Sequence, residues 1–138
     1  IWYDYFSVPQ AAEAVAERKA AIHSIPHYVE SCRYFAMLCP LVKHAHEGTV
    51  MGKRSYISRG WCRLELAARI LSERESSQTT IEVHTSNHQV CAPVGDWILN
   101  SVGEGSFSVS QDLHHSAAVV TSMITRKLRH YLKVGGGF

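Results

Sequence analysis

The sequence lacks the features that mark several large classes of protein. Its four cysteines form no CxxC pair among the 138 residues, so they predict neither a zinc ribbon nor a disulfide scaffold. No apolar run reaches the length that spans a bilayer, and no basic segment with an apolar run and a cleavage site is visible. We therefore expect free thiols, no membrane partner and a cytoplasmic location.

Charge of one sign is also scarce. Lys and Arg number 14 against 12 Asp and Glu, and the net charge of +2 is too small to predict nucleic acid as a partner. The glycine-rich segment 101–107 (SVGEGSF) has neither the Lys-Ser/Thr ending of a phosphate loop nor GxGxxG spacing, and is expected to be a shaped surface loop. The cysteines and histidines lack metal-ligand spacing, so no metal site is expected.

What is present is an ordinary globular composition, 46% hydrophobic and 19% charged, which suits one domain with its own core. Short aromatic, apolar or alternating runs predict strands at 1–6, 33–39 and 79–84. Apolar residues at helical spacing predict helices at 10–24, 60–73 and 112–133. Pro26 is expected to interrupt or kink the chain after the first helix. The segments 40–59 and 90–109 are expected to be mainly loop.

Strands that alternate with helices predict right-handed βαβ units and a parallel sheet. The nearly unbroken apolar run at 33–39 suits a central strand covered on both faces. We expect residues 1–134 to form a single domain and residues 135–138 to begin a linker. The expected buried face of the last helix consists of Leu113, Ala117, Val120, Ile124, Leu128 and Leu132.

Four segments, in this order, resemble a TIR (Toll/interleukin-1 receptor) domain. They are the strand 1–6 with Asp4, the sequence AIHS at 21–24, the apolar strand 34–39 and the sequence SRGWCRLEL at 58–66. The last is similar to the family's S-x-W-C-x-x-E-L pattern, with one extra residue before Trp61. Several short segments of the sequence are also similar to uncharacterised algal TIR-like proteins. This similarity implies no known activity.

The resemblance implies an α/β fold, specifically a flavodoxin-like three-layer sandwich with a parallel sheet. Residues 1–6 would be its second strand, so the fold would be incomplete at the N-terminus, without its first strand and helix. The chain begins at Ile1, and we expect it to be a piece of a longer polypeptide. A parallel sheet that lacks a strand exposes unpaired backbone, and the piece alone is expected to aggregate or dimerise.

The resemblance also implies functional residues. Some TIR domains cleave NAD between nicotinamide and ribose with the Glu of the Trp-Cys-x-x-Glu word, which is Glu65 here. Asp4 and Trp61 would then contact the ligand. Each has a plainer alternative: Glu65 forms a surface ion pair with Arg69, Asp4 caps a turn and Trp61 anchors the core.

A second set of positions falls where TIR domains often contact one another. The residues that would form this interaction loop are Ser7, Val8, Pro9 and Gln10. They depart from the arginine–glycine pattern usual in that loop.

Three functions therefore stay open. The first is a TIR-like signalling module that associates with itself or with another TIR-like domain and uses no cofactor. The second is an NAD hydrolase or cyclase in which Glu65 acts on NAD as substrate. The third is a flavodoxin-like domain of unrelated function, in which the Trp-Cys-x-x-Glu match is accidental.

Overall fold

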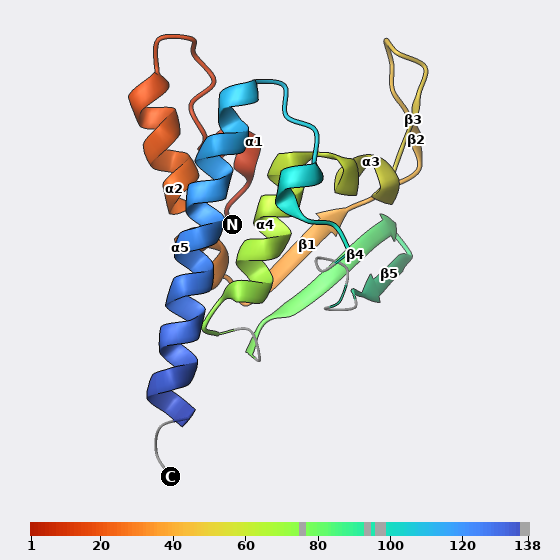
Figure 1. Cartoon of the computed structure of the whole chain (residues 1–138). Coiled ribbons are helices and arrows are strands. Elements are labelled where there is room, and N and C mark those ends of the chain that lie inside the picture. The colour runs from red at the N-terminus through yellow and green to blue at the C-terminus, as the bar shows by residue number, and fades with distance from the viewer. Residues whose placement is uncertain (75–76, 93–94, 96–98, 136–138) are drawn as a thin grey trace.

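The computed structural model describes residues 1–74, 77–92, 95 and 99–135. It is an α/β structure in which three of the helices gather beside one sheet (Figure 1). The helices are α1 (Asp4–Ser7), α2 (Val15–Ser31), α3 (Lys53–Ser58), α4 (Gly60–Leu71), the short 3₁₀ helix η3 (Val102–Glu104) and α5 (Ser110–Gly135). The strands are β1 (Tyr34–Leu38), β2 (Val42–Lys43), β3 (Val50–Met51), β4 (Thr79–Thr85) and β5 (His88–Cys91).

The main sheet is mixed, whereas the sequence predicted a parallel one. Its order is β1-β4-β5; β1 and β4 are parallel, with Ala36 opposite Ile81, and β5 is antiparallel to β4. The predicted β1 and β4 are confirmed. The segment 90–109 begins inside β5, so its first residues are strand and not loop. Only Ser86 and Asn87 separate β4 from β5, a length that suits a tight hairpin.

The prediction of a strand at 1–6 is wrong, because Asp4–Ser7 forms the short helix α1. No described strand lies beside this segment to complete a ladder, and its aromatic side chains pack on one another and on α2 instead. Trp2 stacks on Tyr28 with ring centroids 5.8 Å apart, and Tyr3 contacts Phe6 at 5.2 Å. Aromatic content favours a strand only where a pleated surface receives it.

The three long helices are confirmed, although α2 begins at Val15 and not at residue 10, and further differences occur at Pro26 and in α5. Pro26 lies inside α2, which continues to Ser31; its ring is buried, and this burial offsets the lost backbone hydrogen bond. In α5 the buried residues are Ser116, Val119, Met123 and Lys127. The predicted buried face of α5 is therefore wrong by about a quarter turn. The predicted linker lies outside the described residues from 136 onward.

The core has two parts, which meet at α4. Ten of the twelve residues of α4 are buried, since the helix lies between β1 and the pair α2 and α5. Leu64, Ala68 and Leu71 pack against α2 and α5, whereas Leu66 and Ile70 pack against Met37 of β1. Burial on all sides is what a central helix experiences, and it also draws the charged residues of α4 inside.

β1 is an edge strand of the described sheet, so the prediction of a central, doubly covered strand is wrong. Met37 faces α4 and is buried, while Tyr34 and Leu38 on the opposite face are exposed. β1 pairs with β4 on one side and with no described strand on the other. β2 and β3 form a separate hairpin that projects from the body (Figure 1).

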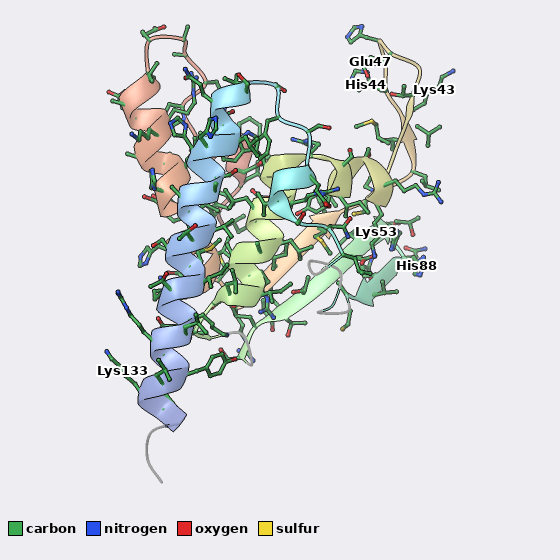
Figure 2. All side chains as sticks on the ribbon, in the orientation of Figure 1. Lys43, His44, Glu47, Lys53, His88 and Lys133 are labelled. Atoms are coloured by element: carbon green, nitrogen blue, oxygen red, sulfur yellow. The ribbon has the colours of Figure 1, made fainter. Side chains whose placement is uncertain are left out.

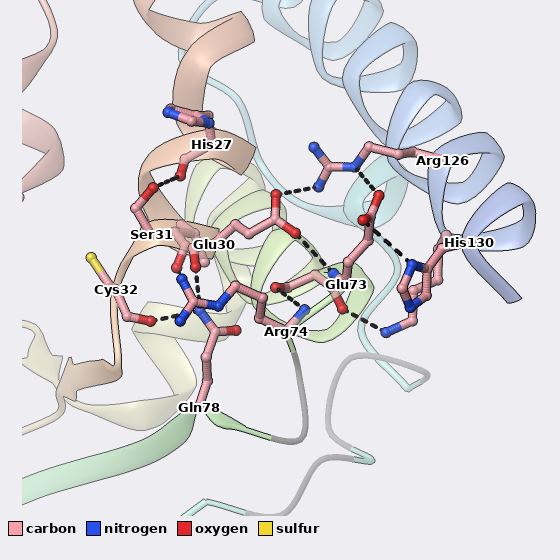
Figure 3. A network of polar contacts seen from close by, with 12 residues as sticks. His27, Glu30, Ser31, Cys32, Glu73, Arg74, Gln78, Arg126 and His130 are labelled. Carbon is pink, nitrogen blue, oxygen red and sulfur yellow. Dashed lines mark hydrogen bonds and ion pairs between the residues drawn. The ribbon is translucent and has the colours of Figure 1, made fainter. Parts of the chain in front are cut away.

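A polar network fixes the end of α2 against α4 and α5 (Figure 3). The guanidinium of Arg126 in α5 lies 2.9 Å from a carboxylate oxygen of Glu30 and 3.4 Å from one of Glu73. The Gln78 side-chain amide donates to the carbonyl oxygens of Val29, at 2.8 Å, and Cys32, at 2.6 Å. These bonds satisfy backbone groups at the C-terminus of α2 and so position the wall of the cavity described next. Among the described residues, no helix is both long enough and apolar enough to cross a membrane.

Candidate functional site

A cavity of about 390 Å³ lies along the free edge of β1. The N-terminal segment with Asp4, the end of α2, and the region where α3 meets α4 complete its walls. Its volume lies within the range of small-molecule sites. Figure 2 shows the side chains of the described residues on the ribbon. In the same orientation, the N-terminal segment lies behind α5 and beside α4 (Figure 1).

Glu65 is the residue of this cavity with the most perturbed chemistry. Glu65 lies in the middle of α4 and is only 8% exposed. Burial raises its pKa to about 8, and the nearby charge and hydrogen bond of Asp4 raise it too; the charge of Arg59 and a hydrogen bond with Tyr56 act in the opposite direction. A buried carboxyl beside a second carboxyl favours the neutral form. Glu65 is therefore mainly protonated at pH 7.

Two other ionisable residues of the cavity wall, Tyr56 and Cys62, keep their protons. Burial raises the pKa of Tyr56 well above its ordinary value of 10.0, with the charge of Glu65 as the next cause. Burial also raises the pKa of the Cys62 thiol to about 12. Tyr56 thus serves as a phenolic hydrogen-bond donor, and Cys62 is an unreactive thiol. The chemistry available here comes from two carboxyls, the guanidinium of Arg59 and the phenols of Tyr3, Tyr34 and Tyr56.

Arg59 is held at the junction of two helices by a close backbone approach. It is the residue between the end of α3 and the start of α4, and its backbone is extended. On either side, Gly60 N–H donates to Ser106 and Ser106 N–H donates to Ser58, each at 2.8 Å. These two bonds tie the 101–107 segment to the helix junction.

This approach requires glycine. A Cβ on Gly60 would lie 2.1 Å from the Phe107 ring, and one on Gly105 would lie 2.5 Å from the Gly60 Cα. Gly60 is the extra residue before Trp61 in the sequence pattern. The glycine-rich segment thus packs on the site from outside and does not line the cavity.

The structure brings Asp4 and Glu65 together and separates Trp61 from them. Trp61 packs partly buried against the main core and meets Phe107 edge-on at 5.7 Å; it does not line the cavity. The alternative of a surface ion pair between Glu65 and Arg69 is wrong, since both residues are buried. Arg69 donates a hydrogen bond to the Gln78 carbonyl oxygen.

The four residues of the predicted interaction loop also lie outside the cavity walls. Ser7 ends α1, and the Gln10 side chain donates to the Val8 carbonyl oxygen at 2.7 Å. Arg18 of α2 donates to the Pro9 carbonyl oxygen at 3.1 Å. These contacts hold the loop against the start of α2.

Sequence reasoning missed three residues of the site. Tyr56 and Arg59 precede the Trp-Cys word, but their roles depend on the turn between α3 and α4. Trp2 also lines the cavity, and its indole N–H is buried with no hydrogen-bond partner among the described residues. An unpartnered buried donor beside a cavity suits a ligand oxygen.

The donor set does not suggest a metal centre. The described residues contain no group of three or more His, Cys, Asp or Glu side chains arranged to hold a metal ion. Comparison of the chain with family models, with curated proteins and with solved structures found no match. The function is therefore argued from the geometry and chemistry of the cavity itself.

Proposed function

We propose that the chain is a TIR-like domain of the flavodoxin-like, three-layer type that cleaves the nicotinamide–ribose bond of NAD, with Glu65 as its catalytic residue. One observation carries the proposal: the Glu of the Trp-Cys-x-x-Glu word is buried in a cavity and has a pKa of about 8. Perturbed carboxyls in cavities are typical of functional sites. The volume of about 390 Å³ suits the nicotinamide riboside portion of the substrate.

The chemistry follows from the charge of the substrate. Nicotinamide in NAD is a cation and leaves as a neutral base, taking the electrons of the C1′–N bond, so its departure needs no proton donor. The ribose left behind has oxocarbenium character, and an anionic Glu65 stabilises that charge. Water then adds at C1′, and its proton passes to Glu65 or to solvent. The phenol of Tyr56 and the indole N–H of Trp2 are available to ribose or amide oxygens.

The pH dependence of this reaction has a definite sign. The reacting form of Glu65 is the carboxylate, and a pKa of about 8 leaves about one tenth of the free enzyme in that form at pH 7. The kcat/KM for NAD should therefore rise with pH and level off above pH 8. A reaction that required Glu65 as a proton donor would show the opposite slope.

The test measures the release of nicotinamide from NAD between pH 6 and pH 9, at high protein concentration. The nicotinamide is quantified by chromatography, and an enzyme-free blank is run at each pH. Glu65→Gln should lower kcat/KM by about 100-fold or more. Glu17→Gln is the matched control, because Glu17 is an exposed residue in the first turn of α2. Circular dichroism and gel filtration establish that each variant is folded. A folded Glu65→Gln variant that keeps the wild-type rate would refute the assignment.

A second candidate function is association without chemistry. It is favoured by the free edge of β1 and by the exposed Tyr34 and Leu38 beside it, since unpaired strand edges pair with other chains. The partner would be a second copy or another TIR-like domain. Absence of nicotinamide release from the wild type at every pH, with assembly demonstrated, would favour this candidate.

A further inference from the structure

The cavity beside β1 combines aromatic side chains with carboxyls. Five of the described residues that line it are aromatic, namely Trp2, Tyr3, Tyr34, Phe35 and Tyr56. Asp4 and Glu65 add two carboxyls to the same wall. The faces of aromatic rings and the oxygens of carboxylates both attract cations, and this attraction is stronger where water is excluded. The lining therefore favours a positively charged ligand over a neutral ligand of the same shape.

The proton on Glu65 neutralises one of the two carboxyls while the cavity holds no ligand. Glu65 hydrogen-bonds to Asp4, and burial, followed by the charge of Asp4, raises the pKa of Glu65 to about 8. Arg59 is the one cationic side chain among the described residues of the wall. It is exposed, and its charge offsets the two carboxyls only in part. A positive charge inside the cavity would therefore stabilise the ionised form of Glu65.

The indole of Trp2 indicates a second feature of the ligand. Its ring stacks on Tyr28 of α2, with centroids 5.8 Å apart and planes 15° from parallel, and this contact holds the indole in place. The Nε1–H group of Trp2 is buried and has no hydrogen-bond partner among the described residues. A buried donor without a partner costs free energy that an acceptor recovers. A ligand with a carbonyl oxygen would supply that acceptor.

We propose that the cavity binds an aromatic cation that carries a carbonyl group, and that each bound cation releases the proton held by Glu65 to solvent. The charge of the ligand replaces that of the proton, so the net charge of the site is the same before and after binding. N-alkylated nicotinamide has both features, since its ring nitrogen is positive and its carboxamide has an oxygen acceptor. This choice of ring rests on the proposed function. There, the arriving substrate would ionise Glu65 and so supply the carboxylate that the reaction needs.

Glu65 is surrounded by titratable or charged groups from several parts of the chain. Those that act on it are Asp4 of the N-terminal segment, Tyr56 of α3, Arg59 between α3 and α4, and Cys62 of α4. The other titratable residues of the described wall are Tyr3, Cys32 and Tyr34. Burial raises the pKa of Tyr56 and that of Cys62, so both stay protonated between pH 6 and pH 8, and Arg59 stays charged. A Glu65 variant is therefore needed to assign the released proton.

Two probes that differ by one methyl group and one charge test the proposal. 1-Methylnicotinamide is the cation and nicotinamide is its neutral counterpart, and neither contains a ribose bond that the protein might cleave. NMR titrations at pH 6, 7 and 8 measure the Kd of each probe. Because the cation binds the ionised form of Glu65, whose pKa is about 8, the Kd of 1-methylnicotinamide should fall by about 50-fold from pH 6 to pH 8. The Kd of nicotinamide should not fall in this way.

Variants assign the pH dependence to its source. Glu65→Gln should bind 1-methylnicotinamide weakly at each pH, because the glutamine side chain does not ionise. Glu17→Gln, at an exposed position of α2, should bind it as the wild type does, and circular dichroism shows that both variants fold. Equal affinity and equal pH dependence for the two probes would overturn the proposal. So would a folded Glu65→Gln variant that keeps the pH dependence of the wild type.

One further measurement needs no variant and separates this proposal from the proposed function. Saturating 1-methylnicotinamide should lower the pKa of Glu65, followed through its carboxyl carbon resonance, by about one unit or more; an unchanged titration would overturn the proposal. Charge-selective binding without nicotinamide release from NAD would keep the cation site and exclude the hydrolase. Nicotinamide release without charge-selective binding would keep the hydrolase and overturn the cation site.

Discussion

Two buried glutamates of this domain have opposite surroundings. Glu82 of β4 is 3% exposed and Glu65 of α4 is 8% exposed. Lys53 of α3 lies 2.6 Å from Glu82, and the imidazole of His84 lies 3.2 Å from it. Glu65 instead has a second carboxyl, that of Asp4, beside it. Burial is thus common to both residues, and the sign of the neighbouring charge distinguishes them.

The difference separates a structural carboxylate from a candidate catalytic one. A buried carboxylate with a close cation keeps its charge, since the pair offsets part of the desolvation. A buried carboxyl beside another acid holds its proton to a higher pH. At a pH where this buried carboxyl ionises, its burial lowers the free energy of unfolding. Destabilising arrangements of this kind are concentrated at functional sites. The comparison therefore predicts opposite responses when each glutamate is altered.

The largest expected effect is a pH-dependent stabilisation by Glu65→Gln. In the folded state Glu65 holds its proton to about pH 8, whereas its ordinary pKa is 4.5. Between these values the folded state binds more protons than the unfolded state, so the free energy of unfolding falls as pH rises. In the Glu65→Gln variant the side chain at this position does not titrate, so this fall in the free energy of unfolding is absent. Relative to wild type it should gain on the order of 4 kcal/mol between pH 5 and pH 9.

Urea unfolding at pH 5, 7 and 9 measures this gain. Other groups titrate over the same range, but the difference between wild type and variant isolates Glu65. Glu17→Gln, at an exposed position, should show no such gain with pH. A constant difference between wild type and Glu65→Gln from pH 5 to pH 9 would contradict the raised pKa.

The next effect is a destabilisation at the other glutamate. Lys53→Met removes the cation 2.6 Å from Glu82 and leaves a buried carboxylate with less compensation. Because the Lys53 side chain is about a third exposed, we expect a loss of about 2 kcal/mol at pH 7 in urea unfolding. Lys43→Met, at an exposed lysine of the β2–β3 hairpin, is the control.

A double variant checks the cause of that loss. Lys53→Met combined with Glu82→Leu removes both charges, so it should recover most of the stability lost by the single substitution. If the double variant is no more stable than Lys53→Met alone, the loss comes from the packing of the lysine chain and not from its charge.

The helices and parallel strands could be predicted because their patterns are local. Periodicity located α4 and α5, and an apolar run located β1. The Trp-Cys-x-x-Glu sequence identifies Glu65, and the resemblance to TIR domains also points to Asp4. Periodicity alone, however, does not say which side of a helix the domain covers, so the buried face of α5 was misplaced.

The rest depended on contacts between distant segments. Residues 1–6 have the composition of a strand, but the aromatic rings pack on Tyr28 of α2. Tyr56 and Arg59 act on Glu65 from the turn before α4. At this turn Gly60 lets Phe107 and Gly105 approach closely. No local pattern encodes that approach. The partnership of Glu82 with Lys53 likewise joins residues 29 positions apart.

The smallest expected effect isolates the role of Asp4 in the comparison. Burial is the largest cause of the raised pKa of Glu65, and the charge of Asp4 is the next. Asp4→Asn removes that charge and keeps the shape, so the pKa of Glu65 should fall by about one unit. The carboxyl carbon resonance of Glu65, followed by NMR from pH 4 to pH 10, reports it directly. Asp112→Asn, in the first turn of α5, should leave the titration in place. If Asp4→Asn also leaves the titration of Glu65 in place, the charge of Asp4 does not contribute to the raised pKa, and the second carboxyl is not what distinguishes Glu65 from Glu82.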